Sequence, residues 1–132
     1  MATLIRITKF AGPAAGIGAL TLGLMHWFLN ISFIGLHIFF GAVVTLALLV
    51  TGIVGLSTSG LRVMGMAAVA LAPVVPLFGM TQTQILVGDL HWLIRVAHLL
   101  VGFAAVGLTE RIGERYSQIG GQTAGMESVS AA

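Results

Sequence analysis

Long apolar stretches separated by short polar turns dominate this chain. Four stretches of roughly twenty or more mainly apolar residues can be delimited, at about residues 10–30, 33–56, 61–80 and 86–112. An α-helix rises about 1.5 Å per residue, so about 20 residues cross the hydrocarbon core of a bilayer, which is about 30 Å thick. The pattern therefore predicts an all-α fold, an integral membrane four-helix bundle with up-down-up-down topology.

Composition agrees with this class. Of the 132 residues, 58% are hydrophobic and only 8% are charged, which excludes a water-soluble domain. The segments fill most of residues 1–118, so we expect one transmembrane domain there. Residues 119–132 are rich in Gly, Ser, Thr and Ala without periodicity, and we expect a disordered polar tail.

The positive charges predict an orientation. Lysine and arginine occur in the amino terminus, in the middle loop and in the carboxy-terminal part of the chain, at Arg6, Lys9, Arg62, Arg111 and Arg115. The other two connections contain neither residue. By the positive-inside rule, both termini are expected in the cytoplasm, in a multi-pass protein of the cell inner (cytoplasmic) membrane. A net charge of +2 is too small to indicate nucleic-acid binding.

All four histidines lie inside or at the edge of an apolar segment. They are His26, His37, His91 and His98. Ionisable groups in a membrane segment are costly and usually face a protein interior or a bound group. A single histidine there is more simply explained by packing, but four together favour a functional role. On segment four, His91, Arg95 and His98 fall on one helical stripe.

Two histidines share a local pattern with a glycine one turn later. His37 is followed by Gly41, and His98 by Gly102. The glycine leaves a flat gap on the helix face, where a porphyrin plane can lie. The two segments cross in the same direction, so we predict one heme b with His37 and His98 as iron ligands. Arg95 is then placed to pair with a heme propionate.

This arrangement resembles one half of heme A synthase and, more generally, four-helix membrane cytochromes b. The resemblance rests on His37 early in the second segment, on Gln82, Gln84 and Gly88 before the fourth, and on His98. It implies that the histidines of the second and fourth helices form the heme-ligand pair. The family has two such halves, and this chain lacks an acidic residue in the outer part of its first segment. The implied function is therefore heme binding and not the synthase reaction.

Helix lengths leave the ligand pairing open. Counted from the inner ends of their segments, His37 lies about 28 Å deep, His98 about 16 Å and His91 about 27 Å. The mismatch between His37 and His98 decreases if segment four continues as a helix to Tyr116. His37 and His98 are the first choice, and His91 and His26 are alternatives or ligands of a second heme.

Three functions are compatible with these features. The first is electron transfer by a b-type heme protein, stand-alone or within a respiratory or photosynthetic complex, with a quinol or quinone as a further partner. The second is a cofactor-free accessory subunit of a larger membrane complex or homo-oligomer. The third is a histidine-based ion or proton pathway, or zinc bound by three histidines, although no intramembrane carboxylate accompanies them. An independent enzyme is less expected, because the chain lacks a nucleophile constellation, a phosphate loop and paired carboxylates. The absence of cysteine excludes iron–sulfur clusters and covalently attached heme.

Overall fold

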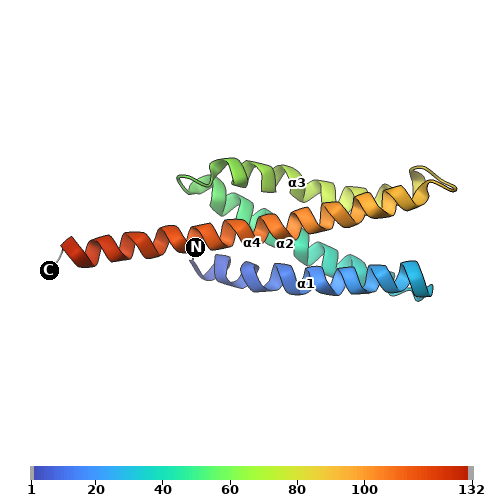
Figure 1. The fold of residues 1–132 in the computed structure, drawn as a ribbon, viewed down its shortest axis with the longest axis horizontal. Helices are drawn as coiled ribbons and strands as arrows, with labels where there is room; N and C mark the ends of the chain where they lie inside the picture. Colours follow the sequence, from blue (N-terminus) through green and yellow to red (C-terminus); the bar gives the residue numbers. More distant parts are fainter. Residues whose placement is uncertain (1, 131–132) are drawn as a thin grey trace.

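The chain folds into a bundle of four α-helices. The structure is a computed structural model that describes the backbone of residues 2–130 and the side chains of residues 3–121. The elements, in order, are α1 (Ala2–Leu29), α2 (Ile34–Ser57), α3 (Arg62–Thr81), the short 3-10 helix η1 (Gln82–Gln84) and α4 (His91–Ser130) (Figure 1). The predicted all-helical class with four long helices is confirmed.

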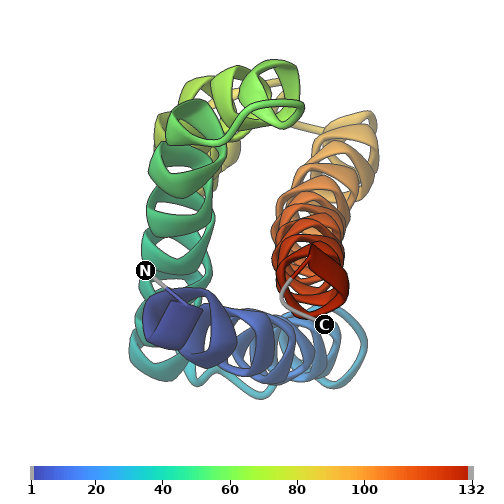
Figure 2. The ribbon, with the colours of Figure 1, turned by 90° about the vertical axis from the view of Figure 1, so that its left-hand side faces the viewer.

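The helices form a ring in the order α1, α2, α3, α4 when the bundle is viewed along its length (Figure 2). Short turns join successive helices, and residues with positive φ occur in each connection, among them Asn30 and Gly60. We call the end where α1 and α3 finish and α2 and α4 begin the histidine end. The opposite end, which carries Arg6, Lys9, Arg62, Arg111 and Arg115, is the basic end.

All four helices are long enough and apolar enough to cross a membrane. The candidate spans are Thr3–Leu29, Ile34–Ser57, Arg62–Gln84 and His91–Gly121. Helix α3 continues through Pro73 and Pro76 to Thr81. The length and apolar character expected from the sequence are thus present in each of the four helices.

Three helix boundaries differ from those predicted. Helix α1 begins at Ala2 and not near residue 10. Helix α4 begins at His91 and not near residue 86, because Leu86 and Gly88 have positive φ angles of 47° and 107°, which interrupt a helix.

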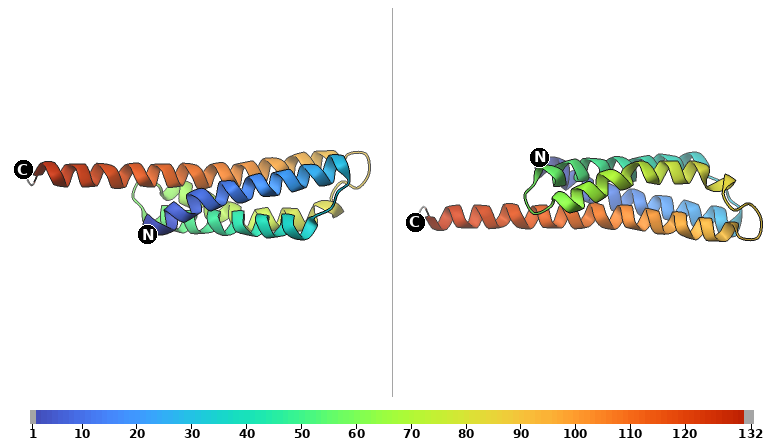
Figure 3. Two further views of the ribbon diagram at one scale, coloured as in Figure 1. Left: turned by 90° about the horizontal axis from the view of Figure 1, so that it is seen from below. Right: turned by 90° about the horizontal axis from the view of Figure 1, so that it is seen from above.

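At its other end, α4 extends well past the rest of the bundle to Ser130 (Figure 3). Residues 119–130, predicted to be disordered, are thus described as helical, and residues 131–132 lie outside the described residues. The sequence after Thr109 holds glutamate, arginine and glutamine, which are good helix formers, and no proline. Continuation through Tyr116 also decreases the difference in depth between His37 and His98 that the segment lengths predicted.

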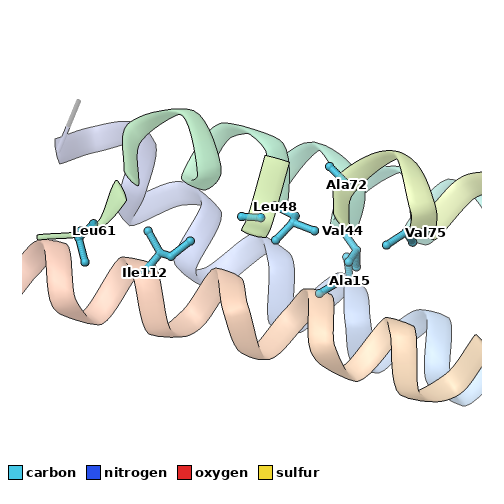
Figure 4. Close-up of a cluster of buried hydrophobic side chains, with 9 residues drawn as sticks. Ala15, Val44, Leu48, Leu61, Ala72, Val75 and Ile112 are labelled. Carbon is cyan, nitrogen blue, oxygen red and sulfur yellow. The ribbon is translucent and has the colours of Figure 1, made fainter. Parts of the chain in front are cut away.

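The tightly packed core lies in the middle and toward the basic end. Its apolar members come from all four helices and include Ala15, Val44, Leu48, Leu61, Ala68, Ala72, Val75, Ala105 and Ile112 (Figure 4). Every buried residue of α2 falls between Val44 and Gly55, and every buried residue of α3 falls between Gly65 and Val75. The histidine end of these two helices is consequently packed less tightly.

Helices α2 and α3 approach each other closely at their glycines near the basic end. A Cβ added at Gly65 would lie 2.5 Å from the backbone nitrogen of Leu56 and 2.8 Å from the carbonyl oxygen of Gly52. These neighbours are backbone atoms that cannot rotate away. Small residues that let helix backbones come this close are typical of helix pairs in lipid.

We therefore expect Gly65→Ala to destabilise the bundle by about 1–3 kcal/mol, because the added methyl group forces α2 and α3 apart. The measurement is thermal unfolding of the detergent-purified protein, followed by circular dichroism. Gly107→Ala on α4 is the matched control, because a Cβ there meets no atom within 4 Å. An unchanged melting temperature in Gly65→Ala would contradict the close approach.

Candidate functional site

His37 lies in the first turn of α2 and points toward α1. Its Nδ1 is 2.9 Å from the carbonyl oxygen of Ala19, and its ring is half-buried. Because a carbonyl oxygen can only accept, this hydrogen bond requires Nδ1–H to be the donor. A neutral ring in that tautomer keeps a lone pair on Nε2, the nitrogen that is free to bind a metal.

Gly23 on α1 lets the His37 ring approach. A Cβ at Gly23 would lie 3.3 Å from Cε1 of His37, which is tighter than ordinary van der Waals contact. The ring therefore rests against bare helix backbone one turn after Ala19. The glycine of α1 and the carbonyl of the same helix together set the orientation of His37.

His98 lies two turns into α4 and points toward α3. Its ring contacts Phe78 edge-on, with 5.9 Å between centroids, and a Cβ at Gly79 would lie 3.2 Å from its Cε1. Its Nδ1 is buried and has no hydrogen-bond partner within the described part of the chain. An unpaired buried nitrogen carries a desolvation cost, so this atom needs an explanation.

The two rings face each other across the bundle. The centroids of His37 and His98 are 6.1 Å apart, and the ring planes make an angle of 50°. The His37 imidazole comes from α2 and rests against Gly23 of α1. The His98 imidazole comes from α4 and rests against Gly79 of α3. The structure thus brings together the two histidines that share the glycine pattern.

Space is left beside this pair on both helices. A Cβ added at Gly41 or at Gly102 would meet no atom within 4 Å. These glycines lie one turn further along α2 and α4 than the histidines. The site therefore combines two facing imidazoles with open helix faces directly beyond them.

The other predicted site residues lie elsewhere at the histidine end. The Arg95 guanidinium is exposed and sits 5.8 Å from the ring centre of Trp27, in a cation–π contact between α4 and α1. His91 places Nδ1 3.3 Å from the carbonyl oxygen of Ile85, and His26 is exposed in the last turn of α1. The described residues contain no group of three or more His, Cys, Asp or Glu side chains that could hold a metal ion.

Sequence reasoning missed part of the surroundings of the two histidines. Phe78 and Gly79 contact His98, and the Ala19 carbonyl accepts from His37. A glycine close to the end of the third segment was the only available signal for Gly79. A backbone carbonyl leaves no signal at all, because every residue has one.

No protein-family model, no curated protein and no solved structure matches this chain. The resemblance to heme A synthase and membrane cytochromes b therefore stays a prediction from the sequence.

The unpaired nitrogen of His98 has a consequence for the stability of protein prepared without heme. His98→Phe should raise the stability, because it removes a buried polar atom whose lack of a partner costs about 1–3 kcal/mol. His37→Phe should lower the stability by about 1 kcal/mol, since it removes the bond to Ala19. Thermal unfolding of both variants in detergent measures the difference. Equal destabilisation by both substitutions would mean that His98 has a partner in the folded protein.

Proposed function

We propose that this chain is a membrane-embedded b-type heme protein that transfers electrons, with His37 and His98 as the iron ligands. The single observation that carries the proposal is the facing pair of imidazoles from α2 and α4, with centroids 6.1 Å apart. When bound, heme supplies one-electron redox chemistry whose potential depends on the surrounding shell. The residues described above account for binding and orientation.

The spacing of the pair is compatible with one metal ion between the rings. Metal–imidazole nitrogen bonds are about 2 Å long, and the centre of an imidazole lies about 1 Å from its nitrogens. Two rings on opposite sides of one ion therefore have centroids about 6 Å apart, close to the value for His37 and His98. His91 and His26 have no comparable partner among the described residues.

The hydrogen bond of His37 also supports ligation. Metal-binding histidines almost always donate their second ring N–H to a carbonyl, a carboxylate or water, which fixes the tautomer. The Ala19 carbonyl provides this acceptor for Nδ1 of His37. His98 has no such acceptor among the described residues, and a water molecule or a cofactor group is the natural partner for its Nδ1.

Packing at the histidine end supports a bound group of substantial size. The open faces at Gly41 and Gly102 flank the pair. The buried residues of α2 and α3 begin at Val44 and Val75 and continue from there toward the basic end. Protein interiors are normally packed to crystal-like density. A planar apolar macrocycle in this region would complete the core that the side chains leave unfinished.

We place both termini in the cytoplasm and the histidine end toward the outer face of the inner membrane, from the positive charges at the basic end. Arg95, one turn outward from His98, is the proposed partner of a heme propionate, and its guanidinium lies 5.8 Å from the ring centre of Trp27. An electron carrier needs a donor and an acceptor. We propose a quinol or a redox subunit of a larger membrane complex for these roles.

Purified protein from heme-replete cells should show a Soret absorption band and a reduced-minus-oxidised difference spectrum of b type. Both His37→Ala and His98→Ala should abolish these bands, because each removes one iron ligand. Absorption spectroscopy with heme quantification per protein chain provides the measurement.

His26→Ala and His91→Ala are the matched controls, because they remove a histidine at the same end without touching the pair. Each should retain the heme content of the unmodified protein. A colourless unmodified protein would contradict the proposal and favour a cofactor-free accessory subunit. Loss of heme in His91→Ala but not in His98→Ala would assign a different ligand.

A second prediction concerns the open helix face beyond His98. Gly102→Leu should lower the heme content per protein chain at least tenfold, because the leucine side chain fills the space needed by the macrocycle. The helical content should stay unchanged. Gly107→Leu is the control, since Gly107 also has open surroundings but lies on a different part of α4. Unchanged heme content in Gly102→Leu would place the heme elsewhere.

A further inference from the structure

A cavity lies at the basic end between the start of α1 and the extended part of α4. It has a volume of about 360 Å³. Its lining residues are Ile5, Arg6, Lys9, Phe10, Tyr116, Ser117 and Gly120. This cavity is at the opposite end of the bundle from the histidine pair and is independent of it.

The lining is positively charged and contains no carboxylate. Arg6 and Lys9 each contribute a cation, while the acidic residues Glu110 and Glu114 of α4 do not line the cavity. The Tyr116 hydroxyl makes no hydrogen bond within the described residues, so it too can donate to a ligand. Ser117 differs, because its hydroxyl already donates to the carbonyl of Gly113 at 2.9 Å.

Helix α4 holds the Lys9 side chain in place. A Cβ added at Gly113 would lie 3.6 Å from Cβ and Cγ of Lys9, so the lysine stem runs over the bare backbone of α4. The residue is half-buried, whereas Arg6 is exposed. The apolar part of the Lys9 side chain is thus packed against α4. Long lysine side chains commonly bury this part and keep the ammonium group in water.

Apolar and polar walls meet in this cavity. Of the apolar lining residues, Ile5 is buried and Phe10 is 69% exposed, and both belong to a helix segment that is apolar enough to cross a membrane. A ligand that suits such a site carries an anionic group next to hydrocarbon. Basic pockets between transmembrane helices on the cytoplasmic side commonly bind anionic headgroups.

We propose that this cavity binds a phosphate group, held by Arg6, Lys9 and the Tyr116 hydroxyl. An anionic phospholipid presents that group together with acyl chains that fit Phe10, and inorganic phosphate presents it alone. Arginine recognises phosphate through its planar fork of donors, and lysine does so as a point charge.

Native mass spectrometry of the full chain in detergent, with added phosphatidylglycerol or phosphatidylcholine, tests the proposal. Phosphatidylglycerol should be retained preferentially. Arg6→Gln and Lys9→Met should each reduce its retention about fivefold, since this is the typical contribution of one basic residue near an anionic membrane surface. Lys9→Met keeps the apolar stem over Gly113, and Tyr116→Phe removes only the hydroxyl and should cause a smaller loss.

Arg62→Met is the matched control, because it removes a positive charge at the same end outside the cavity. Its lipid retention should change by less than a factor of about two.

Inorganic phosphate is added in a separate arm at a concentration equal to that of the lipid. Displacement of phosphatidylglycerol by phosphate identifies free phosphate as the ligand source, and retention of the lipid identifies the headgroup. Equal retention of the two lipids with no phosphate binding, or equal losses in Arg62→Met and Lys9→Met, would overturn the proposal. Helical content by circular dichroism shows that each variant is folded.

Discussion

An imidazole nitrogen removed from water inside an apolar bundle needs a hydrogen-bond partner or a ligand, because its desolvation is otherwise uncompensated. His37 meets this requirement through the carbonyl of Ala19, whereas the buried Nδ1 of His98 has no partner among the described residues. The two rings nevertheless face each other. We propose that this unequal pair binds one heme iron through the Nε2 atoms of both rings, which leaves the bond from His37 to Ala19 intact.

The rest of the architecture is consistent with such a site. Helices α2 and α3 are held together near the basic end by the close approach at Gly65, which fixes one half of the bundle. Toward the histidine end the side chains of α2 and α3 are half-buried or exposed, and a Cβ added at Gly41 or Gly102 would meet no atom within 4 Å. Rigid packing at one end positions the helices, and the looser end provides room. The chain thereby separates the residues that stabilise the fold from those proposed to bind the cofactor.

Much of the fold could be predicted from the sequence because the length of an apolar segment and the spacing of turns have a direct physical meaning in a bilayer. The choice of His37 and His98 followed from Gly41 and Gly102, and the structure places these two rings side by side.

Other features could not be predicted. The Ala19 carbonyl has no signature in the sequence, and the contact of Gly79 with His98 depends on how α3 and α4 align. The start of α4 is delayed by the positive φ angles at Leu86 and Gly88. These angles could not be predicted, because the two residues lie in a mainly apolar stretch that is also typical of a helix. The cation–π contact between Arg95 and Trp27 on α1 could not be predicted either, because it depends on how α1 and α4 pack.

Electron paramagnetic resonance of the oxidised, detergent-purified protein tests the central claim most directly. Two imidazole ligands give ferric heme a low-spin, six-coordinate state, and we expect that signal at one heme per chain. The signal should disappear when either His37 or His98 is replaced by alanine. A high-spin signal in the unmodified protein, or the absence of heme from protein made in heme-replete cells, would contradict ligation by this pair.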